Sequence, residues 1–393
     1  MPSSDSSAVP SFQHLAGPQR VFCGTGSLDG LSRELDRLGC KRAAVVCGAS
    51  LARNGQALAR VREAVGTRLA GVVAGAVEHS PVPAVLEVAR ELQGMQADAV
   101  IAVGGGSAIV TARAASIVLA EGPDVHRLCT QRGADGQWVS PRLARPKLPQ
   151  WVIPTTPTTA CVKAGSAVLE VSMGQRLALF DPKTRAQALF VDPELVATAP
   201  ASLVLSASMN TLAMAVEGLE SLQAHAFSDA LLMQSLRLLA RHLPVADTPA
   251  ARCQLVLAAA LCGQGTDFGG AGLASVLGHA LGHSQGVANG LVNAAVLPHT
   301  MRFNAPATVR GVPQVAAALG AASDPALGAE EAIALVEALL DTLGLPRRLR
   351  DLGVSSSALP EIAGKAMGDW FLQRNPRPVQ GVAELQAVLE AAW

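Results

Sequence analysis

The 393-residue sequence predicts two domains, an N-terminal α/β domain followed by an all-helical C-terminal domain. Up to about residue 200, short apolar runs alternate with amphipathic helical segments, a rhythm typical of a mostly parallel sheet covered by helices. Beyond that point, helix follows helix and the strand pattern stops. The chain is also too long for one ordinary hydrophobic core. We expect a loose leader at residues 1–17, the α/β domain at 18–203 and the helical domain at 204–393.

The segment 98–119 is the clearest single unit of the α/β domain. Its apolar run 99–103 is short, β-branched and free of polar alternation, as expected for a parallel strand buried on both faces. The turn that follows consists of Gly104, Gly105, Gly106 and Ser107, and a helical pattern then begins. This arrangement places backbone N–H groups at the positive end of a helix, where the diphosphate of a nucleotide can bind. A tight turn without a ligand is the alternative interpretation.

The remaining elements follow in order along the chain. In the first half we expect strands at 21–23, 43–47, 69–73 and 150–154, and helices at 28–38, 56–65 and 82–92. The strand at 150–154 opens into a hydroxyl-rich loop that contains Thr155, Thr156 and Thr159. Since parallel strands end at one edge of a sheet, the glycine turn and this threonine loop are expected to line one cleft. In the second half we expect helices at 208–222, 228–243, 250–263, 269–281, 290–304, 330–343 and 382–392.

The composition argues against several classes of protein. Lys plus Arg equals Asp plus Glu, at 31 each, so no net field attracts nucleic acid or an anionic membrane. Aromatic residues make up 3% of the chain, too few for base-stacking surfaces. The seven cysteines form no CxxC pair, and the N-terminus lacks the pattern of a signal peptide. No apolar run reaches the length of a membrane span. We therefore expect a cytoplasmic protein that binds neither nucleic acid nor membrane.

Several motifs resemble those of the iron-containing alcohol dehydrogenase superfamily, most closely its maleylacetate reductase branch. They are GGGSAI at 104–109, IPTTPTT at 153–159, VDPEL at 191–195, ASMNTLAMAVEGLES at 207–221, LPHTMRFNAPA at 297–307 and NPRPV at 375–379. The resemblance implies a Rossmann-like dinucleotide-binding domain plus a helical domain, the dehydroquinate synthase-like fold, often as a homodimer. It also implies reversible hydride transfer between a nicotinamide and an alcohol or carbonyl carbon. On this basis the glycine turn, Thr155, Thr156 and Thr159 are expected to bind NAD(P)H.

The four positions that hold iron or zinc in the metal-dependent members are substituted in this chain. The resemblance assigns them to Asn210, Met214, Ser275 and Asn289. Amide, thioether and hydroxyl groups are poor ligands for such dications. We therefore expect no catalytic metal. The alternative, that the ligands lie elsewhere in the segment, is weakened because His279 and His283 are the only imidazoles nearby.

The end of the strand at 43–47 bears on the choice of nucleotide. Gly48 occupies the place where an acidic residue would bind the adenosine ribose hydroxyls. Without that carboxylate a 2′-phosphate is not repelled, so NADPH is as acceptable as NADH. Gly48 as a simple turn residue is the alternative.

Without a metal, another group must supply charge stabilisation when a carbonyl is reduced. A protonated imidazole can donate a proton as the alkoxide forms. His279 is our first candidate, because the resemblance matches it to a family histidine that lies near the substrate without binding the metal. It also lies one helical turn after Ser275, so we expect both side chains to point into the vacated site. His283 is the second candidate, and either is alternatively a core histidine. Lys163 is a weaker candidate for binding phosphate or a substrate carboxylate, and Cys161 for a nucleophile.

The sequence thus predicts a metal-independent, NAD(P)H-dependent reductase that acts on a small oxo acid or a related carbonyl compound. Two alternatives stay open. One is a non-redox enzyme on the same scaffold, in which a histidine assists elimination, isomerisation or condensation. The other is a non-catalytic relative that binds nucleotide. The expected partner is a small, carboxylate-bearing carbonyl substrate.

Overall fold

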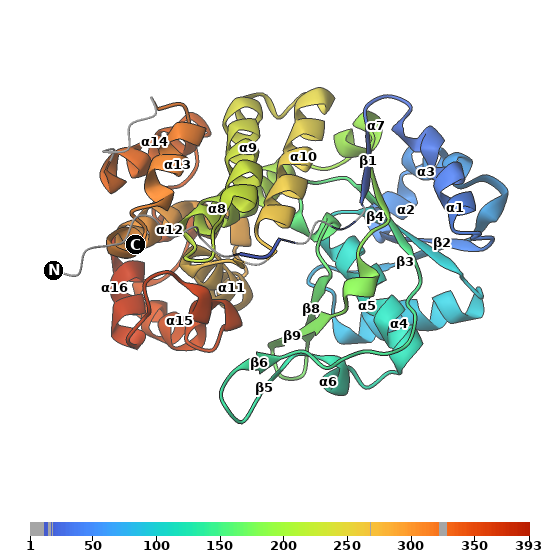
Figure 1. Ribbon diagram of the computed structural model, residues 1–393, viewed down its shortest axis with the longest axis horizontal. Coiled ribbons are helices and arrows are strands. Elements are labelled where there is room, and N and C mark those ends of the chain that lie inside the picture. The colour runs from blue at the N-terminus through green and yellow to red at the C-terminus, as the bar shows by residue number, and fades with distance from the viewer. Residues whose placement is uncertain (1–11, 15–16, 18, 268, 322–327) are drawn as a thin grey trace.

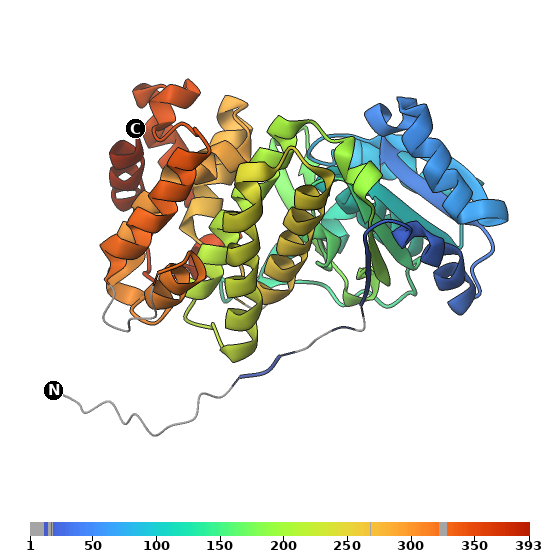
Figure 2. The same ribbon diagram turned by 90° about the horizontal axis from the view of Figure 1, so that it is seen from above.

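The computed structural model describes residues 12–14, 17, 19–267, 269–321 and 328–393, with the side chains of 283–285 left out. The chain folds into two halves that lie side by side (Figures 1 and 2). The blue-to-green half is an α/β unit, and the yellow-to-red half is built from helices. This arrangement confirms the predicted fold class. The expected leader falls almost entirely outside the described residues.

The α/β half is built on a six-stranded parallel sheet with the strand order β1-β10-β7-β4-β2-β3. The five strands expected from the sequence are present, and β10 joins them between β1 and β7. Their bounds are β1 (Arg20–Cys23), β2 (Ala43–Gly48), β3 (Leu69–Ala76), β4 (Ala99–Gly104), β7 (Gln150–Pro154) and β10 (Ala188–Val191).

Helices cover both faces of this sheet, which explains why its central strands β2 and β4 are apolar throughout. Val45 of β2 packs into the cluster formed with α1 (Leu31–Arg37) and α3 (Gly55–Val65). Its neighbour Val46 packs on the opposite face with α4 (Val82–Gly94) and α5 (Gly106–Glu121). A strand buried on both faces has no solvent side, so alternation of polar and apolar residues disappears.

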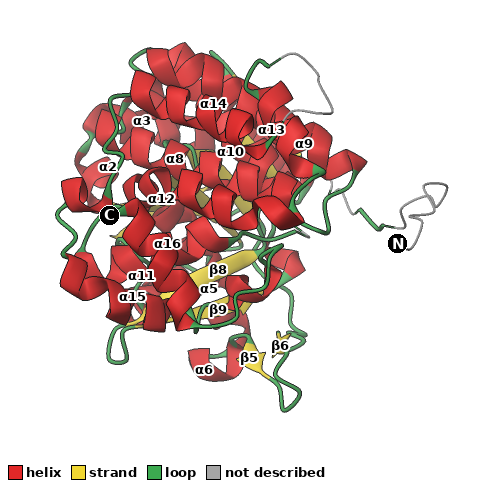
Figure 3. Cartoon of the chain, turned by 90° about the vertical axis from the view of Figure 1, so that its left-hand side faces the viewer, coloured by secondary structure: helices red, strands yellow, loops and turns green. Residues whose placement is uncertain are grey.

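Some elements of the first half have no counterpart in the sequence prediction. An antiparallel hairpin of β8 (Gly165–Glu170) and β9 (Gln175–Phe180) lies outside the main sheet. Figure 3 shows it below the helices of the C-terminal half, beside α11. The smaller elements are the β5–β6 pair (Gln131–Arg132 and Trp138–Val139), α2 (Ala49–Arg53), α6 (Val125–Leu128) and α7 (Pro193–Ala197).

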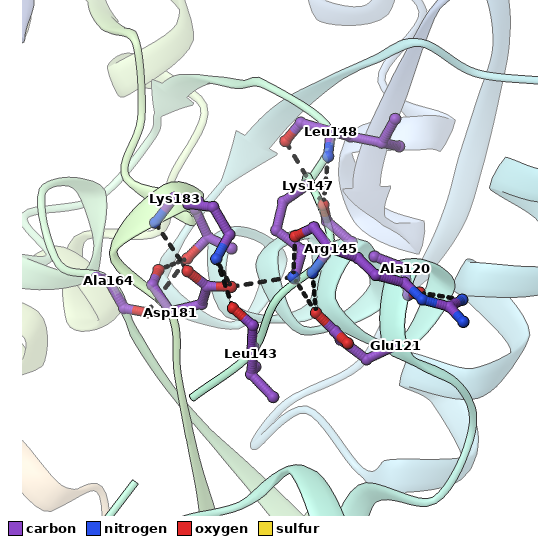
Figure 4. A network of polar contacts seen from close by, with 11 residues as sticks. Ala120, Glu121, Leu143, Arg145, Lys147, Leu148, Ala164, Asp181 and Lys183 are labelled. Carbon is purple, nitrogen blue, oxygen red and sulfur yellow. Dashed lines mark hydrogen bonds and ion pairs between the residues drawn. The ribbon is translucent and has the colours of Figure 1, made fainter. Parts of the chain in front are cut away.

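A buried ionic network fixes the end of the β8–β9 hairpin to α5 (Figure 4). The Lys147 Nζ atom lies 2.6 Å from Glu121 Oε1, at the end of α5, and 3.0 Å from Asp181 Oδ2, just after β9. Lys183 also pairs with Asp181, at 3.1 Å. The hydrogen bond from Lys147 lowers the pKa of Glu121. Because each buried charge has a partner of opposite sign, the ion pairs offset the desolvation cost of burying them, and removal of one partner would leave an uncompensated charge.

The helical half confirms the seven predicted helices and adds α13 and α15. Its members are α8 (Ala201–Glu220), α9 (Ala226–His242), α10 (Pro249–Gly265), α11 (Leu273–Gln285), α12 (Asn289–Asn304), α13 (Gly311–Ala318), α14 (Ala329–Thr342), α15 (Leu359–Ala366) and α16 (Val382–Ala392). Among the described helices, α8 is long and apolar enough to cross a membrane, but 61% of that stretch is buried inside the protein. The helix therefore packs as a core helix of the protein.

Candidate active site

The glycine turn leads from the end of β4 into the start of α5. Gly104 has a φ angle of +141°, a backbone conformation that side-chain-bearing residues rarely adopt. Gly105 is the N-cap of α5 and has no side chain to bond the first N–H groups of the helix. These donors, at the positive end of a 16-residue helix, are suited to an anion such as a diphosphate.

The threonine loop lies directly against the glycine turn. In the sheet Gly104 pairs with Pro154, and the Thr155 N–H donates to the Gly104 carbonyl oxygen at 3.0 Å. A Cβ atom on Gly105 would lie 3.0 Å from Thr156 Oγ1. One on Gly106 would lie 3.1 Å from Thr158 Oγ1. The turn therefore needs glycine because the loop approaches so closely, as the shared edge of the sheet predicts.

The loop is held in place from beneath by a buried arginine. Arg113 of α5 is fully buried, and its guanidinium donates to the carbonyl oxygens of Ala160 and Gly165. Burial lowers the pKa of Arg113 to about 10. At the far end of the loop, Thr159 Oγ1 lies 3.8 Å from Met214 Sδ in the helical half. The threonine loop thus spans the junction of the two halves.

Gly48 ends β2 at the same edge of the sheet. Its strand neighbours β4, with Cys47 paired to Val103, so Gly48 lies beside the glycine turn. Its φ of −84° is open to any residue, and a Cβ atom there would lie 3.3 Å from the Ala76 carbonyl oxygen. Three neighbouring strands, β2, β4 and β7, thus present their loops at one edge of the sheet, the place where a dinucleotide binds in such folds. The contacts of Gly48 and the threonines with such a ligand stay predictions.

The four substituted metal positions lie in the helical half, where Asn210, Met214 and Ser275 contact protein groups and Asn289 lines a pocket described below. The side-chain amides of Asn210, on α8, and Asn293, on α12, lie 2.9 Å apart. Met214 contacts Thr159 as described. Ser275, on α11, donates its hydroxyl to Glu217 Oε2 at 2.6 Å, and its backbone N–H donates to Oε1 at 2.9 Å.

The Glu217 carboxyl group therefore caps the start of α11 and binds the Ser275 side chain, which the sequence analysis had placed toward the emptied site. Burial raises the pKa of Glu217. With Ser275 bonded in this way, the four positions present amide, thioether and hydroxyl groups. Such donors do not fit iron or zinc. Within the described part of the chain, no three His, Cys, Asp or Glu side chains gather where they could hold an ion.

His279 lies on α11 and is held by a carboxylate that the sequence analysis missed. Its Nδ1 atom lies 2.9 Å from Asp369 Oδ2, and the Phe371 N–H donates to Asp369 Oδ1, also at 2.9 Å. Because a carboxylate accepts, Nδ1 carries the proton and Nε2 is the nitrogen left for a substrate.

A narrow pocket of about 10 Å³ lies beside His279. It is lined by His79, Leu169, Arg176, His279 and Asn289. The first three come from the α/β half, and the last two come from α11 and α12. His279 and one former metal position are thus brought together in one cleft. His283 lies on α11 as well, but its side chain is outside the described residues.

The two weaker candidates, Lys163 and Cys161, lie away from this pocket. Lys163 Nζ donates to Thr266 Oγ1 at 2.8 Å and pairs with Asp267 at 3.5 Å. Cys161 is fully buried, and burial raises the pKa of its thiol to about 12, which suppresses the thiolate. Neither residue lines the pocket.

The fold is that of a dinucleotide-dependent dehydrogenase, with a pocket between its α/β half and its helical half. Residues 18–193 match the family described as iron-containing alcohol dehydrogenase, and residues 204–393 match its C-terminal family, described as Fe-containing alcohol dehydrogenase family, C-terminal. The chain belongs to the iron-containing alcohol dehydrogenase family, in its maleylacetate reductase-like branch. It is an oxidoreductase that acts on alcohol or carbonyl groups.

Named relatives extend over nearly the whole chain. Maleylacetate reductase 2 of Cupriavidus pinatubonensis is 30% identical, over 96% of this chain and 95% of its own. Lactaldehyde reductase of Escherichia coli K12 is 29% identical, over 95% and 98%. The crystal structure of maleylacetate reductase from Rhizobium sp. strain MTP-10005 is similar with a TM-score of 0.79, at 25% identity, over 98% and 99% of the two chains.

Proposed function

We propose that this protein reduces a small oxo acid or a related carbonyl compound with NADH or NADPH, and that it does so without a catalytic metal. The observation that carries the proposal is the His279–Asp369 pair in the interdomain pocket, together with four former ligand positions whose donors do not suit a dication. A homodimer and a cytoplasmic location stay predictions.

In the proposed reaction, one group of residues binds the nucleotide and another donates the proton. The nicotinamide cofactor, when bound, supplies hydride for the carbonyl carbon. The N–H groups at the start of α5 bind the diphosphate, and the threonine loop packs beside it. When it is protonated, the His279 ring donates a proton from Nε2 to the carbonyl oxygen as negative charge develops, and Asp369 orients the ring through Nδ1. Donation by His279 replaces part of the stabilisation that a metal gives in other members.

The test is the oxidation of NADH and NADPH with a panel of oxo acids and neutral carbonyl compounds. We expect His279→Asn to lower kcat by about 10²–10⁴-fold at unchanged nucleotide affinity. His242→Asn, at the end of α9 and outside the pocket, serves as the matched control. An unchanged rate in His279→Asn would remove the proton-donor role. Substrate consumption without nucleotide oxidation would instead indicate a non-redox reaction.

A further inference from the structure

We propose that Arg176 forms a carboxylate-binding subsite opposite His279, so that the substrate is a short oxo acid whose carboxylate lies against the β8–β9 hairpin. The placement of the substrate carbonyl group at His279 rests on the proposed function. The placement of the substrate carboxylate is argued from Arg176 and its surroundings alone.

The guanidinium of Arg176 has no ion-pair or hydrogen-bond partner within the described part of the chain. It lines the interdomain pocket and is partly buried, and this burial lowers its pKa. The acid that acts on it electrostatically is Asp369, whose two oxygens are already bonded to His279 and to the Phe371 N–H. A desolvated cation without a direct counter-ion is costly, and an anionic ligand would offset that cost.

The hairpin presents this arginine on an anchored support. Arg176 pairs with Leu169 across the hairpin, and the Leu169 N–H donates to the Ser80 carbonyl oxygen at 3.2 Å. The buried network around Asp181 fixes the end of β9 to α5 (Figure 4). Each strand of the hairpin is thus anchored at one point, so the hairpin can present the guanidinium to a planar carboxylate with two parallel N–H donors.

The same support connects the pocket with the nucleotide-binding turn. His79 and Ser80 adopt left-handed conformations, with φ of +62° and +49°. Such backbone is strained and persists only where its surroundings enforce it. Here Ser80 Oγ donates to the Ser107 carbonyl oxygen at 3.2 Å and accepts from Thr111 Oγ1 at 2.9 Å, so α5 enforces it. The wall that carries His79 is thus fixed to the helix that begins at the glycine turn.

The lining of the pocket also offers an apolar contact. Leu169 lines the same pocket as Arg176 and His279. It can therefore contact the carbon chain that joins the carboxylate of the ligand to its carbonyl group.

The experiment compares short oxo acids with their methyl esters, which keep the carbonyl and lose the negative charge. We expect the acid-to-ester ratio of kcat/KM to fall about 10–100-fold in Arg176→Met, the range for a charge-assisted hydrogen bond, mostly through KM for the acid. Arg176→Lys, which keeps the charge, should restore part of the ratio. Arg62→Met, which removes an exposed arginine of α3, should leave it unchanged. A ratio in Arg176→Met equal to that of the wild type overturns the subsite.

A binding measurement separates this subsite from the proposed function. If the wild type reduces no carbonyl compound, the proposed function fails, and malonate or succinate is titrated calorimetrically into the protein saturated with oxidised nucleotide. Binding that is lost in Arg176→Met and kept in Arg62→Met supports the subsite on its own. Equal affinity in both variants, or no binding to the wild type, overturns it.

Discussion

Two buried glutamates on α8 illustrate how single residues hold the helical half around the site. Glu217 caps the start of α11 through Ser275. Glu220, three residues later, accepts from Asn304 Nδ2 at 3.1 Å. Burial raises the pKa of Glu220 to about 8. Its carboxyl group is therefore largely protonated at neutral pH, whereas the same group in the unfolded chain is ionised.

This difference predicts a loss of stability as pH rises. Between the ordinary glutamate pKa of 4.5 and the folded value of about 8, the folded protein binds more protons at Glu220 than the unfolded chain. The free energy of unfolding therefore falls as pH rises through this interval. The measurement is the free energy of urea unfolding at pH 5.5 and at pH 8. In Glu220→Gln, the difference between these two free energies should be smaller than in the wild type by a few kcal/mol, because each unit of pKa shift corresponds to about 1.4 kcal/mol.

The control is Glu63→Gln, which changes an exposed carboxylate on α3 and should keep the decline of the wild type. A Glu220→Gln variant with the same decline between the two pH values would contradict a proton held by Glu220 in the folded state.

Site residues that lie in a recognisable local motif could be predicted from the sequence. Site residues whose partners are distant in the sequence could not. Gly104 and His279 lie in segments whose neighbours in sequence already indicate a turn or a helix face. Asp369 is 90 residues away from His279, and no local pattern indicates that its carboxylate meets that ring. Arg176 was missed for the same reason, because its proposed role depends on packing between the two halves.

At the scale of elements, the helices around the site are packed unusually closely through glycine. A Cβ atom on Gly290 of α12 would lie 1.8 Å from the Ser206 carbonyl oxygen on α8. One on Gly278 of α11 would lie 1.9 Å from Asn293 Oδ1 on α12. These contacts bring α8, α11 and α12 together, so that Asn210, Asn293 and His279 share one region.

We expect Gly290→Ala to destabilise the protein because the added methyl group meets fixed backbone. A loss of about 1–3 kcal/mol in the free energy of unfolding is typical of such overpacking. Gly364, exposed on α15, has no atom within 4 Å of its Cβ position. Gly364→Ala should therefore raise stability by about 0.5–1 kcal/mol, through helix propensity alone. Urea unfolding measures both, and equal effects in the two variants would contradict the close packing of α12 on α8.

The elements themselves were predicted unevenly, and the reason is their packing. The strands buried on both faces, such as β4, stand out as continuous apolar runs. The β8–β9 hairpin alternates buried and half-buried residues, since one face is covered, and it lies outside the parallel sheet. Its signal, two alternating runs around Gly174, was present in the sequence but weaker than the βα rhythm around it.

At the scale of the whole molecule, the two halves carry separate parts of the proposed site. The α/β half presents the glycine turn and Arg176, and the helical half presents His279. Under the proposed function, a nucleotide and a carbonyl compound would meet in the cleft between the two halves. A ligand that binds only the folded arrangement stabilises it in proportion to its concentration above Kd.

Because of this linkage, we expect nucleotide to raise the stability of the protein and a divalent metal ion to leave it unchanged. NADH or NADPH at 100 times Kd should add about 2.7 kcal/mol to the free energy of unfolding and raise Tm. In Gly105→Val the shift should vanish, because the new side chain meets Thr156 and obstructs the start of α5. Stoichiometric Zn²⁺ or Fe²⁺ should leave Tm unchanged, and a chelator should leave turnover unchanged, because amide, thioether and hydroxyl groups occupy the former ligand positions. A metal-dependent rise in Tm, or activity lost to the chelator, would overturn the metal-independent mechanism while leaving nucleotide binding intact.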